Sequence, residues 1–143
     1  MMDPRIERDN SDAQCDMPRA RLGERVLFVD DERVVREVVQ ELLHELGYAV
    51  VAAESAAAAL EILEVDAAFS LLITDLMMPG MYGIALAKVV RRRWPTLGVV
   101  CCTGYGDASD QARAEAAGIL ILVRKPVALE ALARIVRNAI DRV

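Results

Sequence analysis

The chain is poor in the residues that build transition-metal and redox sites. It has one histidine and three cysteines among 143 residues. Cys15 stands alone in a polar segment, and Cys101 and Cys102 are adjacent, so their side chains would point to opposite faces of a strand. The CxxC spacing of zinc and thiol-exchange sites does not occur. We therefore expect reduced cysteines without a catalytic role, and a surface position on a helix for His44.

Clustered basic residues and long apolar runs are also missing. The formal net charge is −5, and the only basic run, at residues 91–93, falls at the end of a predicted helix, where cations stabilise the helix dipole. Because binding to a nucleic-acid backbone rests on clustered Lys and Arg, we expect no nucleic-acid partner. No apolar segment approaches the ~20 residues that span a bilayer, and the N-terminus has no apolar signal-peptide core. The expected location is cytoplasmic, without membrane contact.

The first part of the chain differs from the rest in composition and in the spacing of its apolar residues. Residues 1–23 mix Pro, Asp, Arg, Asn and Ser without apolar periodicity, which predicts a flexible tail because little surface can be buried there. From residue 24 onward, apolar residues recur at regular spacing. The chain is 55% hydrophobic and long enough for one domain with a packed core. We expect that domain to occupy residues 24–143.

Short apolar runs alternate with helical patterns through this domain. The predicted strands occupy residues 25–30, 48–53, 69–75, 97–104 and 119–126, and the predicted helices occupy residues 34–46, 55–66, 81–94, 108–118 and 128–143. Gly47 fits the residue that follows a helix, and Ser55 fits the N-cap of the next one. Parallel strands joined by helical crossovers form a sheet covered on both faces. The pattern predicts an α/β fold with an open, doubly wound, five-stranded parallel sheet and five helices, and we prefer the strand order 2-1-3-4-5.

Polar residues end four of the predicted strands. Asp30 and Asp31 end the first strand, Asp75 the third, Thr103 the fourth and Lys125 the fifth. The carboxyl ends of parallel strands meet at one edge of a sheet, and ligands bind there where the strand order changes direction. We expect these side chains to converge on that edge, with Asp75 leaving the core rather than being buried in it.

Three carboxylates brought together repel one another, which favours a bound cation. All the candidate ligand atoms are carboxylate oxygens, which are hard ligands and favour Mg²⁺ or Mn²⁺ over zinc. In proteins, Mg²⁺ commonly bridges carboxylates to a phosphate. Asp75, central in the sheet, is the candidate nucleophile for a phosphoryl group, and Asp30 and Asp31 are the candidate metal ligands. The Lys125 ammonium and the Thr103 hydroxyl are suited to phosphoryl oxygens.

At this point the sequence resembles the receiver (phosphoacceptor) domains of two-component response regulators. The resemblance rests on the acidic pair of LFVDDE, on ITDLMMPGMYG, on the threonine of CCTGY and on the lysine of RKP, and it covers residues 24–143. It implies a flavodoxin-like fold. The chain ends within one helix of its last predicted strand, so we expect a receiver of the single-domain type.

The resemblance also implies roles for individual residues. Asp75 would accept a phosphoryl group from a phosphohistidine on a sensor histidine kinase or a histidine phosphotransfer protein. Asp31, Asp75 and the backbone carbonyl of Met77 would ligate Mg²⁺, and Asp30 would reach the metal through water. Lys125 would contact the acyl phosphate. The protein would then be a phosphoacceptor switch that catalyses only its own phosphorylation and dephosphorylation.

In the family, signal output follows movement of the threonine and of an aromatic residue. Thr103 matches the threonine, but Leu122 stands where the aromatic residue is common. A leucine cannot reproduce the inward swing of a tyrosine with its polar tip. Our hypothesis is that Tyr105 takes this part, and that a downstream protein reads a surface within about residues 107–142.

Two other functions stay open. An aspartyl-phosphate-forming, Mg²⁺-dependent phosphohydrolase would carry a second catalytic aspartate two residues after the nucleophile, where this chain has Met77. A degenerate receiver acting as a constitutive interaction module is favoured only by Leu122. Turnover of small phosphate esters would indicate the first alternative.

The hypothesis for Tyr105 predicts a separation of phosphorylation from output. Tyr105→Ala should leave the labelling of Asp75 intact and weaken the phosphorylation-dependent binding of the downstream protein, measured by pull-down with and without a phosphodonor. Unchanged binding by the phosphorylated variant would show that the hypothesis is wrong.

Overall fold

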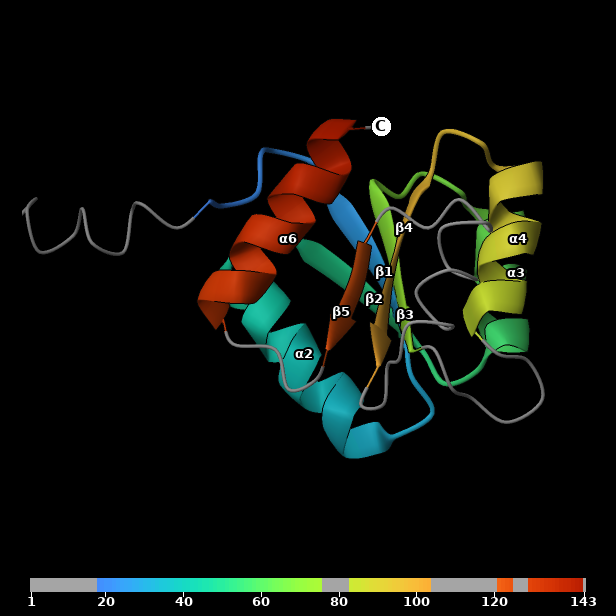
Figure 1. Ribbon diagram of the computed structural model, residues 1–143, viewed down its shortest axis with the longest axis horizontal. Helices are drawn as coiled ribbons and strands as arrows, with labels where there is room; N and C mark the ends of the chain where they lie inside the picture. The colour runs from blue at the N-terminus through green and yellow to red at the C-terminus, as the bar shows by residue number, and fades with distance from the viewer. Residues whose placement is uncertain (1–17, 76–82, 104–120, 125–128, 143) are drawn as a thin grey trace, which may run out of the picture.

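A five-stranded parallel sheet lies between two layers of helices (Figure 1). The computed structural model describes residues 18–75, 83–103, 121–124 and 129–142. Its strands are β1 (Arg25–Val29), β2 (Ala49–Ala53), β3 (Leu71–Asp75), β4 (Gly98–Thr103) and β5 (Ile121–Arg124). Its helices are α2 (Arg33–Glu45), α3 (Ala56–Val65), α4 (Gly83–Arg93) and α6 (Leu129–Arg142).

The strands run in the order β2-β1-β3-β4-β5, and every pair is parallel. This is the order preferred from the sequence, and it places β3 at the centre. Helices α2 and α6 cover one face of the sheet, and α3 and α4 cover the other (Figure 1). The α/β class with a doubly wound parallel sheet is therefore confirmed. The helix expected at residues 108–118 lies outside the described residues.

Two helix ends form as their residues predict. Gly47 follows α2 with φ +97°, a conformation that L side chains rarely adopt. Its N–H donates to the carbonyl of His44, and the N–H of Tyr48 donates to that of Leu43, which is the Schellman arrangement. At the start of α3, the Ser55 hydroxyl accepts a hydrogen bond from the N–H of Ala58 at 3.0 Å. These ends set where the chain turns from α2 into β2 and from β2 into α3.

Strands β1 to β4 supply side chains to two separate cores. Leu27 packs toward α3 and α4, whereas Phe28 packs toward α2 and α6. Cys101 and Cys102 divide in the same way, so the expected opposite orientation of the two thiols is confirmed. Both are buried and neither is in a disulfide, and burial raises the pKa of Cys101 to about 12. A thiol of that pKa forms little thiolate at neutral pH, in keeping with a packing role for Cys101.

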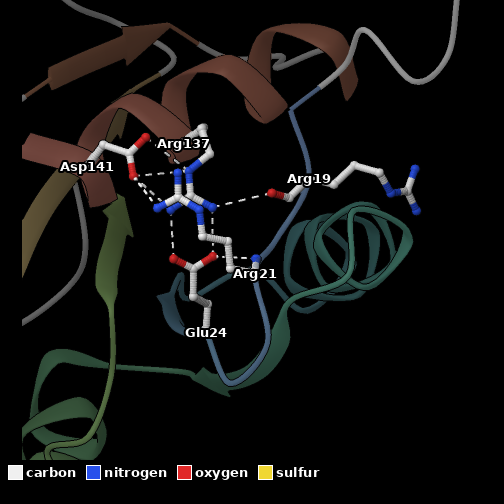
Figure 2. Close-up of polar contacts among 5 residues, drawn as sticks. All are labelled: Arg19, Arg21, Glu24, Arg137 and Asp141. Atoms are coloured by element: carbon white, nitrogen blue, oxygen red, sulfur yellow. Dashed lines mark hydrogen bonds and ion pairs between the residues drawn. The ribbon is translucent and has the colours of Figure 1, made fainter. Parts of the chain in front are cut away.

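An ionic cluster joins the start of β1 to the last helix (Figure 2). The Arg137 guanidinium on α6 donates two hydrogen bonds of 2.7 Å to the Glu24 carboxylate, and the side chains are only 11% and 13% exposed. Arg137 also donates to Asp141 at 2.9 Å, and Arg21 donates to the same carboxylate at 3.1 Å. Arg137 holds the pKa of Glu24 and that of Asp141 below their ordinary values.

The described part of the predicted tail is attached to two helices. Ala20 donates its N–H to the carbonyl of Leu46, and the Arg19 side chain donates to that of Glu45, so both bonds satisfy carbonyls at the end of α2. Arg137 donates to the carbonyl of Arg19. Residues 18–23 thus lie against α2 and α6, and the flexibility of residues 1–17 stays a prediction. Within the described ranges, no helix has the length and apolar character to cross a bilayer.

The cluster predicts a loss of stability in acid. A carboxyl whose pKa is lowered by folding stabilises the folded state above its unfolded pKa, and this contribution is lost as pH falls through the folded pKa. Glu24→Gln should lower the free energy of unfolding at pH 7 by about 1–3 kcal/mol, because a nearly buried charge-assisted pair is broken. It should also flatten the decline of stability below about pH 4, measured by urea unfolding.

The matched control is Glu37→Gln. Glu37 pairs with Arg33 at 3.0 Å on the exposed surface of α2, and such pairs contribute less than ~0.5 kcal/mol. Equal losses in the two variants would contradict a special contribution from the Arg137 cluster.

Candidate functional site

Three carboxylates meet at the carboxyl edge of the sheet. Asp30 directly follows β1, and Asp75 is the last residue of β3, its neighbour in the sheet. One carboxylate oxygen from each of Asp30, Asp31 and Asp75 lies within 4.8 Å of the others. The structure thus brings together the three aspartates that the strand-end pattern singles out.

The burial of these aspartates differs from the expectation. Asp75 was expected to leave the core, but it is only 6% exposed, and Asp30 is fully buried. The reason is that β3 is the central strand: Asp75 still pairs with Cys102 of β4, and the residue before it pairs with the end of β1. Asp31 alone among the three is exposed. The site is a partly buried cluster of carboxylates, which we call the acidic pocket, in which Asp31 is the exposed member.

The main chain around Asp30 is tightly held. Its N–H donates to the carbonyl of Ala53 at 3.1 Å, which ties the end of β1 to the end of β2. Its carboxylate accepts the N–H of Glu32 at 2.9 Å, and its carbonyl accepts a hydrogen bond from the Arg36 side chain at 2.8 Å. Sequence reasoning missed Arg36. The sequence feature that could have pointed to Arg36 is a cation in the first turn of a predicted helix, where the helix dipole disfavours positive charge.

The remaining predicted site residues are described only in part. The backbone of Thr103 ends β4 and pairs with Arg124, the residue before Lys125. Leu122 lies in β5, where its backbone pairs with Cys101. Lys125, Met77 and Tyr105 lie outside the described residues, so their roles stay predictions.

The donor set fits a hard divalent cation. All three ligand atoms are carboxylate oxygens, which Mg²⁺ and Mn²⁺ prefer, and no histidine or cysteine takes part in this cluster. Burying carboxylates side by side is unfavourable without compensating positive charge or hydrogen bonds. The arrangement can therefore bind a cation and use it to bring an anionic group, such as a phosphoryl group, next to Asp75.

Crowding of the carboxylates predicts that neutralising one of them stabilises the metal-free protein. Asp75→Asn should raise the melting temperature in EDTA by about 2–5 °C, since one of three neighbouring negative charges is removed. Mg²⁺ should raise the melting temperature of the wild type more than that of the variant. Asp66→Asn removes an equal charge from an exposed pair with Arg25 and should not stabilise. A lower melting temperature for Asp75→Asn in EDTA would contradict the crowding argument.

Comparison with known proteins agrees with this geometry. The family model described as "Response regulator receiver domain" matches residues 26–137. The response regulator protein FleR of Pseudomonas aeruginosa is 38% identical over 122 residues, which are 85% of this chain and 26% of FleR. The C4-dicarboxylate transport transcriptional regulatory protein DctD of Rhizobium meliloti is 33% identical over 82% of this chain. The chain spans about a quarter of the length of these two relatives.

A solved structure shows the same fold. The response regulator receiver domain protein of Clostridium thermocellum superposes with a TM-score of 0.79 at 29% identity, over 83% of this chain and 95% of that one. By sequence and by fold, this chain belongs to the response regulator receiver domain family.

Proposed function

We propose that this chain is a phosphorylation switch that accepts a phosphoryl group on Asp75. The observation that carries the proposal is the meeting of Asp30, Asp31 and Asp75 at one sheet edge in a member of the receiver family. Membership of that family supports a role in phosphorelay signalling. The donor would be a phosphohistidine on a sensor histidine kinase or a histidine phosphotransfer protein.

In the proposed reaction, a carboxylate oxygen of Asp75 attacks the phosphorus atom in line with the bond to the donor histidine. The new O–P bond forms as the P–N bond breaks, and the imidazole nitrogen keeps the electron pair. The burial of Asp75 would limit the access of water to the acyl phosphate. Thr103 would donate a hydrogen bond to the phosphoryl group, and the Lys125 ammonium would offset its charge.

Receiver domains use Mg²⁺ in the acidic pocket, and the carboxylates of this chain fit that ion. Asp31, Asp75 and the backbone carbonyl of Met77 would ligate it, with Asp30 acting through water. When bound, the ion would supply positive charge that the phosphoryl oxygens need as they approach Asp75. The chain is then its own catalyst and has no substrate that it turns over.

The start of α2 offers a surface for the donor protein. Val34 and Val38 are one turn apart on this helix and are 69% and 51% exposed. The helix begins three residues after Asp30, beside the acidic pocket. A donor that brings a phosphohistidine to this edge would bury these valines, which favours a protein as the phosphodonor. Output would then pass through residues 107–142, which include α6.

The experiment is phosphoryl labelling with two donors. The wild type should be labelled once by acetyl phosphate and by a phosphorylated kinase, as measured by intact-mass spectrometry. Asp75→Asn, or chelation of Mg²⁺ with EDTA, should abolish both reactions, whereas Asp66→Asn should be labelled normally. Persistent labelling of Asp75→Asn, or labelling in EDTA, would contradict the mechanism.

A further inference from the structure

The first turn of α2 carries two cations and no acid. These are Arg33 and Arg36, and the positive end of a helix dipole disfavours both. Arg33 is exposed and pairs with Glu37 on the helix surface. Arg36 is half-buried and reaches back along the helix, where its Nη1 donates to the carbonyl oxygen of Asp30 at 2.8 Å. An unfavourable position for the charge thus coincides with a contact to the acidic pocket.

The carbonyl that Arg36 holds belongs to the peptide unit between Asp30 and Asp31. A peptide unit is planar, so fixing its oxygen also fixes the direction in which the chain reaches the Cα of Asp31. Asp30 has further constraints from Ala53 and Glu32. Among the described residues, none bonds to the Asp31 carboxylate, so its direction depends on how the main chain on either side is held. Arg36 is the side chain that bonds to the carbonyl oxygen of the peptide before Asp31.

We propose that Arg36 is a positioning residue of the acidic site. Its hydrogen bond holds the peptide between Asp30 and Asp31 so that both carboxylates meet Asp75 at the spacing a divalent cation requires. The inference rests on the proposed function only in taking the pocket to bind Mg²⁺. It adds a residue of α2 that sets the affinity for the ion without touching it.

The positive charge of Arg36 should by itself weaken Mg²⁺ binding, whereas its hydrogen bond to Asp30 should strengthen it. The direction in which the affinity changes when Arg36 is replaced therefore tests the proposal. A guanidinium near the pocket repels Mg²⁺, so removing it should tighten binding if charge were its only contribution. Removing a residue that orients metal ligands typically weakens metal binding about 10–100-fold. A positioning role therefore predicts weaker binding despite the loss of a positive charge.

The test is isothermal titration of Mg²⁺ into the full chain without any phosphodonor. Arg36→Ala should bind Mg²⁺ about 10-fold more weakly than the wild type. Arg36→Lys keeps the charge and a donor nitrogen on a shorter side chain, so its affinity for Mg²⁺ should lie between those of the wild type and Arg36→Ala. Arg33→Ala is the matched control, because it removes the same charge from the same turn without a contact to Asp30, and it should bind at least as tightly as the wild type.

Two results would overturn the proposal. One is Mg²⁺ binding by Arg36→Ala that is as tight as that of Arg33→Ala. The other, which decides the matter if Arg36→Ala does not fold in circular dichroism, is Mg²⁺ binding by Arg36→Met, which keeps the aliphatic chain but has no N–H donor, that is as tight as that of Arg33→Ala. If the wild type binds Mg²⁺ and is labelled by acetyl phosphate, these results refute only the positioning role of Arg36 and leave the proposed function standing. If the wild type neither binds Mg²⁺ nor is labelled, the proposed function fails with it.

Discussion

The site depends on placing carboxylates close together at the end of the central strand of a parallel sheet, where the surrounding elements bury them. Asp75 ends the central strand with neighbouring strands on both sides, and its carboxylate meets those of Asp30 and Asp31. Such an arrangement is unfavourable by itself, so the surrounding structure must hold the acids in place and leave room for positive charge. Asp30 is held in this way, because it donates its N–H to Ala53 and accepts hydrogen bonds from Glu32 and Arg36. In the proposed function, a divalent cation would offset the negative charge of these acids and of the incoming phosphoryl group.

Local patterns were enough to predict most of the fold. Ser55 and Gly47 mark helix ends through bonds to residues only a few positions away, and the alternation of apolar runs with helices requires a covered parallel sheet. The same topology brings Asp30, Asp31 and Asp75 together, because it sends every strand end to one edge. The site was therefore predictable at the level of which residues meet.

Other features depend on contacts that a single sequence does not reveal. The burial of Asp75 follows from how far its strand pairs with β4, which the apolar pattern alone leaves undefined. The contact of Arg36 with a main-chain carbonyl depends on the rotamer of a long side chain. The attachment of residues 18–23 to α2 and α6 joins distant segments, and a polar composition gave no sign of it.

The bond between Glu24 and Arg137 joins residues 113 positions apart. A covalent crosslink of that span would restrict the unfolded chain, but an ion pair exists only after folding has already brought its partners together. Nearly all of the sheet and its helices lie between Glu24 and Arg137. Packing of these elements already brings the two ends of this segment together, so the ion pair restricts the chain very little further. The pair therefore requires α6 to lie against the face of the sheet that β1 shares with it, and its presence marks the docking of this helix near the start of β1.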